Sequence, residues 1–95
     1  MSKSPPYKIE VSPAADRDIQ KLNDRIRSED FERLAAAIDE LATEPRPHGV
    51  RTIEGAVIAY RIRAGNYRVV HDIYDDKKLV VLLQVVRRSE TIYKS

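Results

Sequence analysis

The sequence has no cysteine and no tryptophan, and only three of its 95 residues are glycine. Without cysteine, neither a disulfide framework nor a thiolate metal site is possible. The longest apolar run, at 79–86, is interrupted by Gln84 and is far shorter than the roughly 20 residues that cross a bilayer. The N-terminus also lacks the apolar stretch of a secretory signal. We therefore expect a soluble, cytoplasmic protein with no membrane partner.

Charge is distributed unevenly along the chain. Residues 1–45 carry seven Lys or Arg and ten Asp or Glu, a balance of −3, whereas residues 46–95 carry ten and five, a balance of +5. A basic half of this kind attracts polyanions such as nucleic acid. Ordinary solvated surface charge explains the same numbers equally well, so charge alone leaves both interpretations open.

The N-terminal part of the chain predicts a strand followed by two helices. After a disordered lead-in at 1–6, which holds two prolines, residues 7–11 alternate as a strand. Ser12 and Pro13 then signal a helix start, because a serine hydroxyl caps free N–H groups and proline suits the first helical position. The expected helices cover about 13–22 and a segment from 24 or 28 to 43.

Beyond the helices the apolar period changes from about 3.6 residues to about 2, which is typical of strands. Strands are expected near 57–64, 67–75 and 79–87, with a short extended segment near 50–53. They predict a three- to four-stranded antiparallel sheet with one face against the helices, since a sheet needs a partner layer to make a core. The expected fold class is α+β, in one domain over 7–95.

A hairpin around Gly65 and Asn66 decides which side chains share a sheet face. A two-residue loop pairs Arg63 with Arg68 and leaves both, with Arg61, on the face away from the helices. A three-residue loop would place Arg68 among apolar side chains, so the hydrophobic pattern favours the shorter loop. Like charges directly opposite one another destabilise a sheet. The pairing therefore suggests an anion between the guanidinium groups.

A phosphodiester is the anion that best fits, because planar guanidinium forks bind its oxygens in pairs. Arg87, at the end of the last strand, is expected to join the same patch. Tyr93 beside these arginines suggests a base stacked on a ring while its phosphate is held. The alternative is exposed strand arginines that only cover apolar surface.

Three stretches carry a family likeness: IEG at 53–55, AYRIRAGNYRVVHDIYDD at 59–76 and VVRRSETIY at 85–93. With them the chain resembles the RelE/ParE superfamily of bacterial toxins, and within it the RelE-like messenger-RNA endoribonucleases. The resemblance implies a RelE-like fold and an enzyme that cuts mRNA in the ribosomal A site without a metal or other cofactor. A 2′-hydroxyl attacks the adjacent phosphate, leaving a 2′,3′-cyclic phosphate and a 5′-hydroxyl.

The resemblance also implies roles for individual residues. Arg61 and Arg63 fall where the RelE toxin has basic residues, one of them proposed as general base. Arg68 matches an arginine that stabilises charge on the phosphorane. Arg87 matches one that helps the leaving group, and Tyr93 matches a tyrosine that orients the attacked nucleotide. The residues expected to bind RNA around these catalytic candidates are Arg51, Arg88 and Lys94.

The general base is the least defined part of this prediction. Where RelE has lysines this chain has arginines, and a guanidinium does not give up its proton in proteins. The alternatives are Tyr93, Glu54, His71, a ribosomal group or water. Of these, His71 is expected to be a hydrogen-bonded core histidine opposite Tyr60.

No metal site is expected. His48 lies in a loop far from the other histidine, with no partner at metal-ligand spacing. The acidic residues Asp72, Asp75 and Asp76 lie near a hairpin tip, where aspartate usually forms turns.

Two other functions remain open on the sequence alone. ParE-like toxins share the architecture and inhibit DNA gyrase by binding it, without nuclease chemistry. An inactive, basic RNA-binding relative is the other possibility. The expected partners of the toxin are a cognate acidic antitoxin, the ribosome and mRNA, with operator DNA reached only through the antitoxin complex.

Overall fold

The structure is a computed structural model that describes residues 7–23, 26–47, 50–53 and 59–87. The expected lead-in at 1–6 lies outside these residues. The described chain forms two α-helices, five strands and one short 3-10 turn, at Asp75–Lys77, between the last two strands. In chain order they are β1 (Lys8–Val11), α1 (Pro13–Asn23), α2 (Ser28–Glu40), β2 (Arg51–Ile53), β3 (Ala59–Ala64), β4 (Tyr67–Tyr74) and β5 (Leu79–Arg87).

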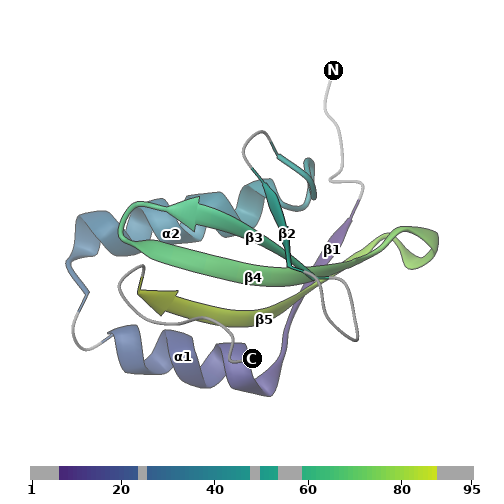
Figure 1. Cartoon of the computed structure of the whole chain (residues 1–95). Coiled ribbons are helices and arrows are strands. Elements are labelled where there is room, and N and C mark those ends of the chain that lie inside the picture. The colour runs from purple at the N-terminus through teal and green to yellow at the C-terminus, as the bar shows by residue number, and fades with distance from the viewer. Residues whose placement is uncertain (1–6, 24–25, 48–49, 54–58, 88–95) are drawn as a thin grey trace.

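The sheet is mixed, with the strand order β1-β5-β4-β3-β2. Strands β2 to β5 are antiparallel neighbours, as the sequence predicts. β1 joins them as a fifth strand, parallel to β5. Helix α1 packs beside β5 and α2 runs along β3 and β4 (Figure 1). The α+β class and the element order expected from the sequence are confirmed.

Helix α1 begins where the sequence signals it. The Ser12 hydroxyl accepts a hydrogen bond from the Ala15 N–H at 3.1 Å, which satisfies one of the free donors of the first turn. Pro13 occupies the first helical position, where no N–H is needed. The Ser12 N–H donates to the Leu82 carbonyl at 3.1 Å, so the helix start is also tied to β5.

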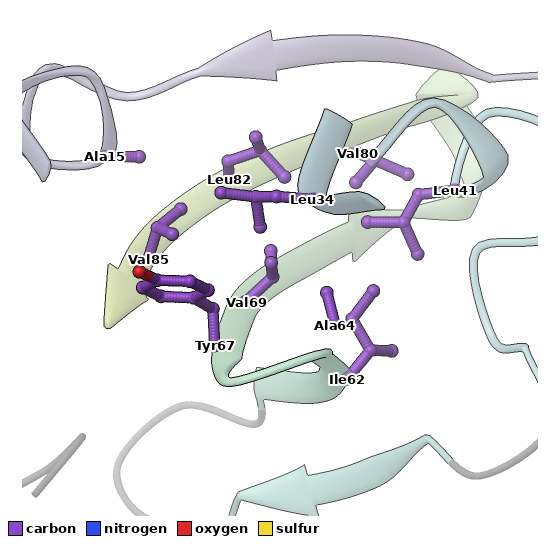
Figure 2. Packing of buried hydrophobic residues seen from close by; sticks show 10 residues of the cluster. All are labelled: Ala15, Leu34, Leu41, Ile62, Ala64, Tyr67, Val69, Val80, Leu82 and Val85. Atoms are coloured by element: carbon purple, nitrogen blue, oxygen red, sulfur yellow. The ribbon is translucent and has the colours of Figure 1, made fainter. Parts of the chain in front are cut away.

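The core lies between the helices and one face of the sheet. Leu34 and Leu41 project from α2 and its C-terminal turn toward Val69, Val80 and Leu82 (Figure 2), and all five are at most 1% exposed. Burying side chains of this size contributes about 1.5–3 kcal/mol each relative to exposure. This packing holds one face of the sheet against α2, and α2 does not cover the opposite face.

The hairpin between β3 and β4 has the predicted two-residue loop. Ala64 pairs with Tyr67 and Arg63 pairs with Arg68. Gly65 has φ +61°, a left-handed conformation that a glycine adopts without steric cost. The loop therefore sets the register, and the register sets which side chains reach each face.

β5 contains a bulge that the sequence pattern does not reveal. Val70 pairs with Gln84 but His71 pairs with Leu82, so Leu83 has no partner on β4. The extra residue changes the alternation, and Val85 enters the core where regular pairing would have placed Gln84. Everything in β5 beyond the bulge is thereby moved to the opposite face.

Candidate phosphate-binding site

Four arginines share the sheet face that points away from the helices. In the antiparallel register Arg51 is opposite Arg61, and Arg63 is opposite Arg68. Arg61 and Arg63 are two residues apart on β3, so both pairs lie on one face. Ile62, between them, faces the core. The predicted common face of Arg61, Arg63 and Arg68 is confirmed, and Arg51 belongs to it.

These four side chains line a hollow of about 450 Å³, which we call the arginine hollow. It is completed by Ile62 and, on the side of α2, by Ala37, Glu40 and Pro47. The described part of β2 pairs with β3 only as far as Arg61, so no described strand lies on that edge of β3 from Ile62 onward. A hollow of this volume falls in the usual range for small-molecule sites.

The arginine hollow is strongly cationic. Its described lining contains four guanidinium groups and one carboxylate, that of Glu40. Two pairs of like charges stand directly opposite one another in the sheet, an arrangement that costs stability. Each guanidinium offers a planar set of donors that matches the oxygens of a phosphate group.

Arg87 does not lie with these arginines. It pairs with Tyr67 on the helix side of the sheet, where it lines a second hollow of about 270 Å³ with Asp18, Lys21 and Tyr67. The expectation that Arg87 joins the patch is therefore wrong. The physical reason is the bulge at Leu83, which reverses the alternation of β5 before Arg87 is reached.

Several predicted residues lie outside the described part of the chain. They are Arg88, Tyr93 and Lys94 of the candidate site, together with Glu54 and His48. Their roles stay predictions.

His71 is a core histidine, as predicted. It is fully buried, its Nε2 lies 2.9 Å from the Pro45 carbonyl oxygen, and its ring stacks on Tyr60 with centroids 5.8 Å apart. Burial lowers the pKa of His71 from its usual value, although the hydrogen bond to Pro45 opposes this shift. Because it is fully buried and does not line the arginine hollow, His71 is not placed to contact a ligand there.

An ion pair that local sequence patterns did not reveal holds the segment after α2. The guanidinium of Arg46 donates to the two carboxylate oxygens of Asp75 at 3.2 and 2.9 Å, and the Tyr7 hydroxyl donates to the same carboxylate at 2.6 Å. Arg46 and then Tyr7 lower the pKa of Asp75 to about 2. The pair connects the β4–β5 turn to Arg46. The next residue, Pro47, lines the arginine hollow.

Asp75 thus does more than form a turn. It begins the 3-10 turn as expected, with its carbonyl accepting the Lys78 N–H at 3.3 Å, and it also anchors Arg46. Among the described residues, no group of three or more His, Cys, Asp or Glu side chains is placed to hold a metal ion. No helix in the described part of the chain is long and apolar enough to cross a membrane.

The fold and the hollow define a small α+β protein with its helices on one sheet face, four arginines on the other, and a cationic hollow beside β3 that α2 also lines. Comparison with known proteins identifies the family. The profile described as the ParE toxin of the type II toxin-antitoxin system, parDE, matches residues 9–92. No protein of curated function matches the sequence. The chain belongs to the ParE toxin family, within the RelE/ParE superfamily, and is a toxin of a type II toxin–antitoxin pair.

Solved structures of the same superfamily have the same fold. The archaeal RelE–RelB complex from Pyrococcus horikoshii OT3 matches with a TM-score of 0.72 and 23% identity, covering 90% of this chain and 98% of that one. The RelBE2 toxin–antitoxin complex of Mycobacterium tuberculosis matches with a TM-score of 0.65 and 30% identity, covering 87% and 99%. The isolated E. coli RelE toxin matches with a TM-score of 0.66 and 20% identity, covering 90% and 88%.

Proposed function

We propose that this toxin is a ribosome-dependent endoribonuclease that cleaves mRNA in the ribosomal A site. The observation that carries the proposal is the convergence of four arginines on one sheet face around a hollow of about 450 Å³. Guanidinium groups gathered in this way offer planar sets of donors that match phosphate oxygens. The resemblance to RelE-like nucleases in the hairpin and β5 sequences supports the same assignment.

In the proposed reaction the 2′-hydroxyl of one nucleotide attacks the phosphate that joins it to the next. Negative charge develops on the phosphorane oxygens, and Arg61, Arg63 and Arg68 lie together where they can stabilise it. Charge stabilisation of this kind is often the largest single contribution to catalysis. Arg51 extends the cationic surface along β2 and binds the neighbouring phosphate. The small domain relies on the ribosome to order the message.

The partners follow from the same site. An acidic antitoxin segment that covers the arginine hollow would neutralise the charge and block the substrate at once. The family consists of toxins of toxin–antitoxin systems, and two of the three solved structures described above are toxin–antitoxin complexes, which supports such a partner. Operator DNA is bound only through that complex.

A second candidate function is inhibition of DNA gyrase by binding, as the resemblance to ParE-like toxins implies. The match to the ParE profile over residues 9–92 favours it. In that case the arginine hollow is a protein-binding surface and no RNA is cut.

Induction of the chain in cells, followed by growth measurement and primer extension on a reporter message, separates the two functions. We expect growth arrest with discrete cuts inside translated codons. Arg68→Ala should reduce cleavage by at least ~10²-fold, the loss seen when one charge-stabilising donor is removed. Arg17→Ala, an exposed arginine on α1, is the matched control and should cut normally.

Two outcomes would count against the proposal. Arrest with intact messages and altered DNA supercoiling would contradict it and favour gyrase inhibition. Equal cleavage by Arg68→Ala and wild type would mean that the arginine hollow is not the reaction site. Arg87→Ala tests the leaving-group role separately, because Arg87 lies on the other sheet face.

A further inference from the structure

The described lining of the arginine hollow contains one carboxylate, that of Glu40. Attack by a 2′-hydroxyl is faster when a base removes its proton, and guanidinium groups do not serve, because they stay protonated. His71 is buried in the core and does not line the hollow. Within the described lining, the remaining titratable group is the carboxylate of Glu40.

Glu40 has a defined position beside the arginines. It is the last residue of α2, one turn after Ala37, so both reach the same side of the hollow. Its carbonyl accepts hydrogen bonds from the N–H groups of Thr43 and Glu44 at 3.1 and 2.8 Å, which fixes the backbone at this point. The side chain itself is exposed and lines the hollow.

The Glu40 carboxylate is not neutralised by the neighbouring arginines. In the described part of the chain it forms no ion pair with Arg51, Arg61 or Arg63, although all of them line the same hollow. A carboxylate that faces a phosphate site repels the anion and so weakens binding. Its presence in an otherwise cationic lining therefore calls for a role that offsets this repulsion.

We propose that Glu40 is the general base of the reaction, an inference that rests on the proposed nuclease function. The proton of the 2′-hydroxyl passes to a Glu40 carboxylate oxygen as O2′ bonds to phosphorus. The bond between phosphorus and the 5′ oxygen breaks, and this oxygen takes a proton from water. The products are a 2′,3′-cyclic phosphate and a 5′-hydroxyl, and Glu40 returns its proton to solvent.

The test compares Glu40→Gln with wild type on ribosomes programmed with a defined message. Glutamine keeps the size and polarity of the side chain but accepts no proton. We expect a loss of at least ~10²-fold in the cleavage rate at saturating toxin, in the range that a general base supplies. Affinity for a message with a 2′-deoxy nucleotide at the cleavage site should be unchanged or higher, because a negative charge next to the phosphate is gone.

Glu44→Gln is the matched control, since Glu44 is an exposed glutamate just beyond α2 that does not line the hollow. It should cut at the wild-type rate. The pH–rate profile adds an independent readout: we expect a fall in rate toward acid pH in wild type and no such fall in Glu40→Gln.

The outcomes separate this inference from the function on which it rests. If wild type cuts and Glu40→Gln cuts equally fast or faster, Glu40 only repels phosphate, and its role as base is overturned while the nuclease stands. A loss in Glu40→Gln that leaves the shape of the pH profile unchanged would also overturn it. If wild type does not cut, both the nuclease and the base are overturned.

Discussion

The buried His71 should make folding stability depend on pH in a predictable direction. Its Nε2 shares a hydrogen bond with the Pro45 carbonyl, so the neutral ring carries its proton on Nε2 and leaves Nδ1 bare. Within the described residues Nδ1 has no hydrogen-bond partner. Protonation would create a buried charge whose new N–H finds no acceptor there. The folded state therefore resists protonation, which is why the pKa of His71 is lowered.

The sign of the effect follows from this shift. Below the ordinary histidine pKa of about 6.5 the unfolded chain binds a proton that the folded chain does not. The free energy of unfolding therefore decreases as the pH is lowered. In this range the free energy of unfolding decreases by about 1.4 kcal/mol per pH unit. The dependence ends once the pH is below the pKa of His71 in the folded state. From about pH 7.5 to about pH 5.5 the loss is then at most about 1.4 kcal/mol. For a domain of this size that lowers Tm by about 5–10 °C.

Urea unfolding at several pH values across this window measures the effect. Asp75 does not interfere, because its pKa of about 2 lies far below the window. His71→Gln removes the imidazole but leaves His48 in place, so the difference between the two pH slopes belongs to His71. Identical slopes in wild type and His71→Gln would refute the reasoning, even if the variant is less stable at every pH.

Three further predictions concern contacts that support the site. The Asp18 carboxylate accepts a hydrogen bond from the Val85 N–H of β5 at 2.9 Å. Asp18→Ala should therefore lower the free energy of unfolding by about 1–3 kcal/mol and speed hydrogen exchange at Val85, and unchanged exchange would contradict this role. Gly65→Ala should cost about 1–2 kcal/mol in urea melts from backbone strain alone, because nothing lies within 4 Å of the added Cβ. Arg46→Ala should raise the Asp75 pKa from about 2 toward 3.8 in an NMR titration, so the stability that the ionised Asp75 contributes should be lost at a higher pH. A pKa that stays near 2 in this variant would show that the ion pair does not cause the shift.

The arginine face was predictable from the sequence because it depends on local rules. Alternation in β3 and β4 and a two-residue loop at Gly65 fix the pairing of Arg63 with Arg68. A slip by one residue would have buried a charge, which excluded the other register. The Ser12 cap of α1 was equally local. Each prediction needed only neighbouring residues and one energetic penalty.

The position of Arg87 was not predictable by the same means. β5 is apolar at nearly every position, so its sequence does not show where alternation changes, and the bulge at Leu83 becomes visible only when β5 is paired with β4. The parallel pairing of β1 with β5 was missed for a related reason: a strand pattern identifies a strand but not its neighbour.

Contacts between distant segments also escaped the sequence. Arg46 and Asp75 are 29 residues apart and meet only because the β4–β5 turn folds back toward the end of α2. Glu40 reads as an ordinary charged residue near a helix end, and its place in the arginine hollow depends on how α2 packs beside β3. Neither position carries a local signal.

The central claim is that the arginine hollow holds the phosphodiester that is cut. The most direct measurement is incubation of the purified toxin with ribosomes carrying a message of known sequence, followed by analysis of the ends of the products. We predict fragments with 2′,3′-cyclic phosphate and 5′-hydroxyl ends, formed by wild type and Arg17→Ala, reduced at least ~10²-fold in Arg68→Ala, and absent when the nucleotide at the cut carries no 2′-hydroxyl. An uncut message with wild type, or equal cutting by Arg68→Ala, would contradict the claim.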